Sequence, residues 1–223
     1  MVGIVVAMEK ESKFVFDKII NRKPITICGK EAYTGVLFGE EVVAIISGIG
    51  KVNAGMATQC LIDKFNPKYI LNFGTAGGID NSVKVADFMV IEKCCQFDFD
   101  LSAIDPVPVG YLQDYNGIYF NASAKHINFL KKCNLATADR FSFDPKDIDL
   151  IKKLGCSLRD MEGGAIGEVC TANKVPLVMI KGVTDIYGNP SNEFYQNLMY
   201  VCGHFPAIIE KVMNALTIRK AFN

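Results

Sequence analysis

The chain has 223 residues, of which half are hydrophobic and 22% are charged, so it can bury a full core. Its 24 basic and 24 acidic residues give a formal net charge of zero, and the lysines are scattered along the sequence. This balance argues against nucleic acid and anionic membranes as partners, since both are bound through clustered positive charge.

The first residues lack the basic start, long apolar stretch and small-residue cleavage site of a signal peptide. No apolar run approaches the roughly 20 residues of a membrane span. The eight cysteines lie mostly within apolar segments and form no CxxC pair, which indicates reduced, buried thiols. The only histidines, His126 and His204, are far apart in the sequence. We therefore predict a cytoplasmic protein with no membrane attachment and no metal.

The first third of the chain alternates apolar, β-branched runs with segments of helical spacing. Strands are predicted at 2–7, 25–28, 32–39, 42–48 and 69–74. Helices are predicted at 9–20 and 51–65. This alternation is typical of an α/β sheet with crossover connections.

The middle of the chain is less regular. Residues 85–97 are predicted to form a strand, and residues 98–122, rich in Asp, Pro, Gly and Tyr, a long loop. A loop of this length in a compact domain usually serves function or an interface. Residues 123–132 are predicted to be helical, with Ser123 as N-cap, and residues 139–149 to form a second loop.

The last third is regular again. Residues 156–162 lead into a helix that begins near Glu162, and residues 175–185 read as a strand with a polar end. A long amphipathic helix is predicted at about 193–218, in which Pro206 should cause a kink or an interruption. The chain shows no internal repeat and no low-complexity segment, so residues 1–223 are predicted to form one domain.

Three acidic residues stand at the ends of predicted strands. Glu11 follows GIVVAMEK, Glu162 lies in LRDMEGGAI, and Asp185 ends PLVMIKGVTD. A carboxylate in such apolar surroundings is costly unless it has a partner or a function. Because a parallel sheet delivers its strand ends to one edge, the three acids together predict a polar ligand crevice.

Each of these signals also has a purely structural interpretation. Glu11 could simply stabilise the first turn of its helix, and Asp185 could cap the turn that follows it. The glycine-rich stretches NFGTAGG (72–78) and SGIGKVNAG (47–55) could be structural turns or could bring backbone N–H groups close to a ligand. Neither stretch has the spacing of a P-loop or of GxGxxG. The glycines after Glu162 suggest that something approaches closely there.

Over nearly its whole length the chain resembles the nucleoside phosphorylase/nucleosidase superfamily, most closely the 5'-methylthioadenosine/S-adenosylhomocysteine nucleosidases. The resemblance runs through GIVVAMEKE, YTGVLFGEEVVAIISGIGKV, NFGTAGG, RDMEGGAI and KGVTDIYG, in that order. It implies a single-domain α/β fold whose central mixed, partly curled sheet is flanked by helices. It also implies a homodimer, with the loop around Phe97–Pro108 at the subunit interface. Enzymes of this kind use water and no cofactor to cleave the bond between adenine and the ribosyl group.

The resemblance assigns roles residue by residue. Asp185 matches the acid that donates a proton toward adenine N7, and Glu11 matches the residue that deprotonates the attacking water. Met161 and Glu162 match the ribose site, where the carboxylate accepts hydrogen bonds from the 2'- and 3'-hydroxyls. The remaining substrate-binding positions, on the base, the sugar or the 5' side, are Ile49, Thr75, Ala76, Gly77, Phe141, Ser142 and Thr184. Of these, Phe141 would stack on adenine and Ser142 would read its edge through the backbone.

Water is expected to be the nucleophile rather than phosphate. The related phosphorylases hold phosphate with arginines, including one just ahead of the glycine turn, where this chain has Asn72. Two departures from the nucleosidase pattern are Thr75 in place of serine and Lys181 in place of arginine. A phosphorylase, a nucleosidase for aminofutalosine and a non-catalytic binding relative remain as alternatives, and the preferred 5'-substituent stays open.

Overall fold

The computed structural model describes residues 1–141, 144–188 and 194–218. The first half contains β1 (Val2–Val6), α1 (Glu9–Phe16), β2 (Ile20–Ile27), β3 (Lys30–Leu37), β4 (Glu40–Ile46), α2 (Lys51–Phe65), β5 (Ile70–Gly78) and β6 (Phe88–Gln96). The second half contains β7 (Phe120–Asn121), β8 (Lys131–Thr137), α3 (Pro145–Lys153), β9 (Leu158–Asp160), α4 (Gly163–Ala172), β10 (Leu177–Ile186) and α5 (Phe194–Ile218).

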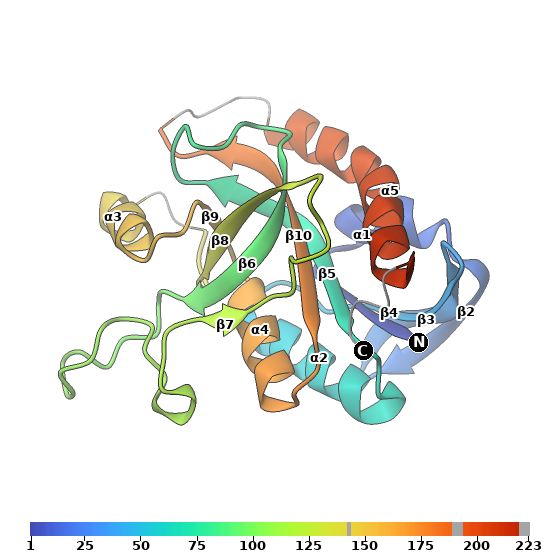
Figure 1. Cartoon of the computed structure of the whole chain (residues 1–223), viewed down its shortest axis with the longest axis horizontal. Helices are drawn as coiled ribbons and strands as arrows, with labels where there is room; N and C mark the ends of the chain where they lie inside the picture. Colours follow the sequence, from blue (N-terminus) through green and yellow to red (C-terminus); the bar gives the residue numbers. More distant parts are fainter. Residues whose placement is uncertain (142–143, 189–193, 219–223) are drawn as a thin grey trace.

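All the described strands belong to one mixed sheet, in the order β10-β6-β8-β9-β5-β1-β4-β3-β2, with β7 beside β6. Strand β10 also pairs with β5, so five of the strands close into a ring while β1, β4, β3 and β2 extend from it (Figure 1). The pairs of β5 with β1 and with β10 are parallel, whereas those of β10 with β6 and of β5 with β9 are antiparallel. The predicted mixed, partly curled sheet is thus confirmed.

Helices cover the sheet from two sides, and each side has its own apolar core. Along β1 the side chains alternate: Val2, Ile4 and Val6 pack in the cluster that includes α1 and α5. Val5 points the other way, into the cluster that includes α2 and α4. This alternation follows from the two-residue period of a strand, and burial on both faces explains the continuous apolar run.

Residues 98–119 form an arm that leaves the body of the molecule between β6 and β7 (Figure 1, green, lower left). Its regular structure is a short 3₁₀ turn, Gln113–Tyr115. The prediction of a long loop is therefore confirmed for this segment. Ile104 in the arm is 84% exposed.

The predicted helix at 123–132 is wrong. The Ser123 backbone N–H donates to the carbonyl of Leu177 at 2.6 Å, which ties this segment to the start of β10 instead of opening a helix. From Lys131 onward the chain joins the sheet as β8, in parallel with both β6 and β9. The apolar spacing of Ala124 and Ile127 reflects burial of an irregular segment in the α1/α5 core. Strand pairing, which one segment's spacing cannot reveal, decided the structure here.

Other boundaries also differ from the predictions. Helix α1 ends at Phe16 rather than at residue 20, and β2 already begins at Ile20. The expected loop at 139–149 turns into α3 at Pro145, where the Asp144 side chain caps the helix by accepting from the Lys146 N–H at 2.9 Å. Proline suits this first position because its missing N–H would have no helical partner there. Helix α5 continues through Pro206 without interruption. In the part of the chain that the structure describes, no helix has both the length and the apolar character of a membrane span.

Candidate active site

A cavity of about 290 Å³ opens at the sheet edge where β5 and β10 end, beside the start of α1. The structure gathers the residues selected from the sequence around it: Glu11, Ile49, Thr75, Ala76, Gly77, Phe141, Met161, Glu162, Thr184 and Asp185. Ser142, the remaining predicted site residue, lies outside the described residues. The three acids that stand up to 174 positions apart in sequence therefore share one pocket, as the strand-end argument predicts.

Glu11 joins the first turn of α1 to the end of β5. Its Oε1 accepts from the backbone N–H of Thr75 at 2.6 Å and from the Thr75 hydroxyl at 2.7 Å. Its Oε2 accepts from the Met8 N–H at 3.3 Å, so it also serves the helix start. Burial raises the pKa of Glu11, against the lowering effect of these hydrogen bonds and of Lys181. A buried carboxylate of raised pKa is well suited to accept a proton.

Asp185 lies near the end of β10, where the register with β5 shifts between Val183 and Asp185. Its Oδ1 accepts from the Thr184 hydroxyl at 3.0 Å, and its Oδ2 forms a salt bridge with Arg159 Nη2 at 3.0 Å. Both side chains are buried. Arg159 is not among the site residues predicted from the sequence, although it stands two residues before Met161 in the motif RDMEGGAI.

Glu162 sits at the junction of β9 and α4. Its Oε1 accepts at 2.9 Å from the backbone N–H of Gly50, which caps α2 with φ of 97°. The glycines of SGIGKVNAG thus make a tight turn and also present an N–H to this acid. Burial, together with the nearby charge of Asp160, raises the pKa of Glu162 to about 7. This carboxyl therefore titrates near neutral pH.

The glycines that follow Glu162 allow close packing of α4 on the sheet rather than approach of a ligand. A Cβ at Gly163 would lie 2.5 Å from Leu135, and one at Gly164 would lie 2.9 Å from the carbonyl oxygen of Cys95. The second glycine-rich stretch, NFGTAGG, is the end of β5 itself and not a turn.

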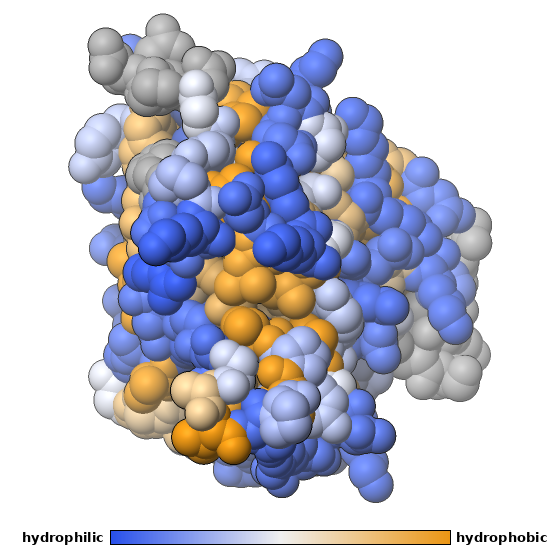
Figure 2. All heavy atoms as spheres, turned by 90° about the vertical axis from the view of Figure 1, so that its left-hand side faces the viewer, coloured by the Kyte–Doolittle hydropathy of each residue, from blue (hydrophilic) through white to orange (hydrophobic). Residues whose placement is uncertain are grey.

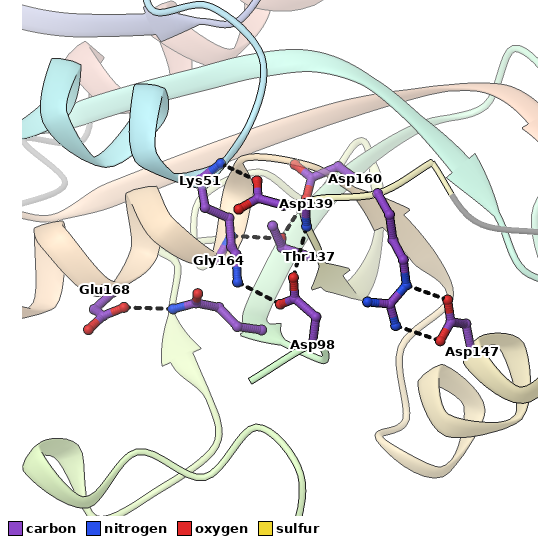
Figure 3. A network of polar contacts seen from close by, with 10 residues as sticks. Lys51, Asp98, Thr137, Asp139, Asp147, Asp160, Gly164 and Glu168 are labelled. Atoms are coloured by element: carbon purple, nitrogen blue, oxygen red, sulfur yellow. Dashed lines mark hydrogen bonds and ion pairs between the residues drawn. The ribbon is translucent and has the colours of Figure 1, made fainter. Parts of the chain in front are cut away.

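A buried ion pair between Lys181 and Asp160 lies close to Glu11 and Glu162. Lys181 Nζ lies 2.9 Å from Asp160 Oδ2, with side chains only 2% and 1% exposed. Thr137 holds Asp160 through its hydroxyl at 2.5 Å and accepts from the Gly164 N–H at 2.7 Å (Figure 3). Burial alone would lower the pKa of Lys181, but the charges of Asp160, Glu162 and Glu11 outweigh it and raise the pKa. The lysine ammonium thus balances a cluster of three carboxyl groups.

Replacing Lys181 with Met is expected to lower the free energy of unfolding by about 3–5 kcal/mol at pH 8, because it leaves buried carboxylates without their cation. At pH 5 the loss should be smaller, since protons can neutralise the acids. Urea unfolding at both pH values measures it. The matched control is Lys13→Met, which removes an exposed ion pair with Asp17 and should cost less than about 1 kcal/mol. Equal losses for the two variants would contradict the prediction.

Aromatic side chains form the mouth of the cavity. Phe141 is exposed at the rim and meets Phe194 edge-on, with ring centroids 6.2 Å apart. Phe194, Tyr195 and Leu198 come from the start of α5 and line the pocket, as does Ile49. Phe194 and Tyr195 are not identifiable as site residues from the sequence alone, since the face of α5 that meets the cavity depends on how the helix packs.

Comparisons with known proteins agree with this architecture. The family model described as "Phosphorylase superfamily" matches residues 1–213. The 5'-methylthioadenosine/S-adenosylhomocysteine nucleosidase of Anoxybacillus flavithermus is 34% identical, over 96% of this chain and 98% of its own. The corresponding enzyme of Colwellia psychrerythraea, solved in complex with adenine, superimposes with a TM-score of 0.86 at 29% identity, covering 96% of this chain and 95% of that one.

A third relative is the nucleosidase of Neisseria meningitidis in complex with methylthio-immucillin-A. It gives a TM-score of 0.87 at 25% identity and covers 96% of this chain and 99% of that one. Together with the matched family model, the full-length relative above 30% identity settles the family. The chain belongs to the phosphorylase superfamily and, within it, to the 5'-methylthioadenosine/S-adenosylhomocysteine nucleosidases.

Proposed function

We propose that this protein hydrolyses the N-glycosidic bond of 5'-methylthioadenosine and S-adenosylhomocysteine, releasing adenine and the thioribosyl sugar. The observation that carries the proposal is the convergence of Glu11, Glu162 and Asp185 on one cavity. Membership in a family of nucleosidases supports it. The presence of all three acids argues against a relative that only binds nucleosides.

The proposed roles follow the positions of these groups. Breaking the bond between C1' and N9 leaves its electron pair on the purine and builds positive charge on the sugar. Asp185 donates a proton to N7, so the base leaves neutral. Water adds to C1' and loses a proton to Glu11, whose raised pKa suits a base. Asp185 then takes up a proton from solvent and Glu11 releases one to solvent, which restores the starting state of both acids.

Glu162 and Met161 are proposed to hold the ribose, with the Glu162 carboxylate accepting from its hydroxyls and stabilising the developing cation. We place the base between Phe141 and the β5 end at Thr75, Ala76 and Gly77. The 5'-substituent then points toward Ile49 and the first turn of α5. These assignments use the lining of the cavity and the motifs of the sequence together.

Two arginines, Arg140 and Arg159, line the cavity and would be the groups to grip phosphate. Arg140, however, is clamped to Asp147 by two bonds of 2.6 and 2.7 Å, and Arg159 is paired with Asp185. Asn72, at the position where the phosphorylases carry arginine, is buried and donates to the carbonyl of Val5. An amide at this position, in place of a phosphate-binding arginine, favours water as the nucleophile over phosphate.

The test is adenine release from 5'-methylthioadenosine in phosphate-free buffer, followed by chromatography of base and sugar. We expect full activity without phosphate and a free thioribose as product. Strict dependence on phosphate, with a sugar 1-phosphate as product, would overturn the proposal in favour of a phosphorylase. A Glu11→Gln protein serves as the inactive reference.

We further propose that the single domain of residues 1–223 works as a cytoplasmic homodimer. Figure 2 views the molecule from the side of the arm and shows apolar residues gathered between polar ones. Val52 on α2, 80% exposed, and Ile104 in the arm are large apolar side chains open to solvent, which a second copy could cover. All eight cysteines are free thiols, as suits a reducing compartment. Light scattering of the purified protein tests the dimer.

A further inference from the structure

The proposed reaction does not use Arg159, although its guanidinium lies in the part of the cavity assigned to the base. Its side chain is 6% exposed. Nη2 donates to Asp185 Oδ2 at 3.0 Å, and Nη1 donates to the carbonyl of Gly78 at 3.4 Å. The guanidinium carbon lies 5.5 Å from the centroid of the Phe141 ring. The planar cation is therefore held between the end of β5 and the ring on which the base is proposed to stack.

The end of β5 makes room for this cation. A Cβ at Gly77 would collide with Arg159 Nη1 and would lie 2.9 Å from Asp185 Oδ2. Because Gly77 pairs with Arg159 itself in the antiparallel ladder of β5 and β9, the fold presents the arginine directly to the acid. The strand pairing and the space left by Gly77 thus fix Arg159 in the base subsite.

The chemistry of the guanidinium selects among purines. It carries five N–H donors and no acceptor, and it can hold a carboxylate along one edge while it donates to a base along another. On a purine, the 6-substituent stands next to N7, where Asp185 acts. In adenine this substituent is an amino group, which is itself a donor. In a 6-oxopurine it is a carbonyl oxygen, and arginine pairing to O6 and N7 is the commonest specific base contact in nucleic-acid recognition.

We propose that Arg159 enables the base subsite to bind 6-oxopurines, so that 5'-substituted inosines are substrates alongside the adenosine compounds. The inference rests on the proposed nucleosidase function and specifies the base that it accepts. The same C1'–N9 bond breaks and water again adds to C1'. The electron pair passes to the 6-oxopurine, where the guanidinium offsets its charge at O6 until a proton from Asp185 or solvent reaches N7.

The experiment compares 5'-methylthioinosine with 5'-methylthioadenosine in parent, Arg159→Met and Arg159→Lys proteins. We expect the parent to cleave the inosine compound with kcat/KM within about tenfold of the adenosine compound or above it. In Arg159→Met the ratio of the two kcat/KM values should fall by about 10–100-fold against the inosine compound. Arg159→Lys, which keeps the charge without the fork, should fall between them. The matched control is Arg140→Met, which removes the other arginine of the cavity and should leave the ratio unchanged.

Calorimetric binding of free hypoxanthine and adenine supplies a readout that does not need turnover. We expect Arg159→Met to lose affinity for hypoxanthine selectively, by a similar factor. A parent that cleaves only the adenosine compound, or a ratio that Arg159→Met leaves unchanged, would overturn this inference and leave the proposed function standing. If neither nucleoside is cleaved, the proposed function fails. Equal affinity of parent and Arg159→Met for hypoxanthine would then refute the base assignment as well.

Discussion

Asp185→Asn is expected to lower kcat for 5'-methylthioadenosine by about 10²–10⁴-fold, the usual contribution of a general acid. The amide has nearly the shape of the carboxyl group and can still accept from the Thr184 hydroxyl, but it has no acid proton for N7. The base would have to leave as an anion, which is a poor leaving group. Stopped-time assays of adenine release, with protein at high concentration, measure the residual rate.

The fold should survive this change. Asp185 forms its salt bridge with Arg159 at the edge of a cavity, and the strand that carries it is held by backbone pairing to β5 and β6. Circular dichroism of the variant should therefore resemble that of the parent, while its melting temperature should be lower because the buried Arg159 loses its charged partner. Asp149→Asn, an exposed change on α3, is the matched control and should keep full activity. An Asp185→Asn protein within tenfold of the parent would refute the assigned role.

Glu162→Gln is expected to abolish useful turnover and, above neutral pH, to make the protein more stable. Activity falls because a neutral amide cannot stabilise positive charge on the sugar. Stability rises because the ionised Glu162 is buried next to Asp160, which is why its pKa is raised to about 7. Gln can still accept from the Gly50 N–H, so the packing is kept.

The raised pKa of Glu162 decides whether the variant gains or loses stability at each pH. The pKa of Glu162 is higher in the folded protein than its ordinary value of 4.5, so folding favours the protonated form. The parent therefore loses stability from this group as the pH rises from about 4.5 to about 7. We expect Glu162→Gln to raise the free energy of unfolding by about 1–3 kcal/mol at pH 8 and by little at pH 4. Urea unfolding at the two pH values decides it, and a variant less stable than the parent at pH 8 would contradict the argument.

The strand-end acids show what a sequence can predict about such a site. Glu11 and Asp185 each follow an apolar run that is long enough to be a buried strand, and parallel pairing then brings them to one edge. The direction of the strands is enough to bring these two acids together, whatever the detail of the side-chain packing. Most elements of the first and last thirds of the chain followed their local patterns, since there local spacing and tertiary packing agree, although β2 begins at Ile20, within the predicted first helix.

Other features depend on contacts between distant segments. The segment 123–132 has apolar spacing that a helix would share, and only pairing of β8 with β6 and β9 excludes the helix. Arg159 reads in the sequence as an ordinary charged residue before a strand end. Its meeting with Asp185, 26 positions later, depends on the register of β9 against β5 and on the absence of a side chain at Gly77.

Strands β10, β6, β8, β9 and β5 form a closed ring that carries some of the site residues but not others. The acid on β10 and the arginine on β9 belong to a closed framework in which each of these strands has a neighbour on either side. The aromatic wall from the start of α5 stands outside that framework. Substitutions at Phe194 and Tyr195 can therefore retune which sulfur-bearing tail is admitted without disturbing the chemistry of bond cleavage. The groups that cleave the bond and the groups that select the 5'-substituent can therefore change independently, by natural substitution or by design.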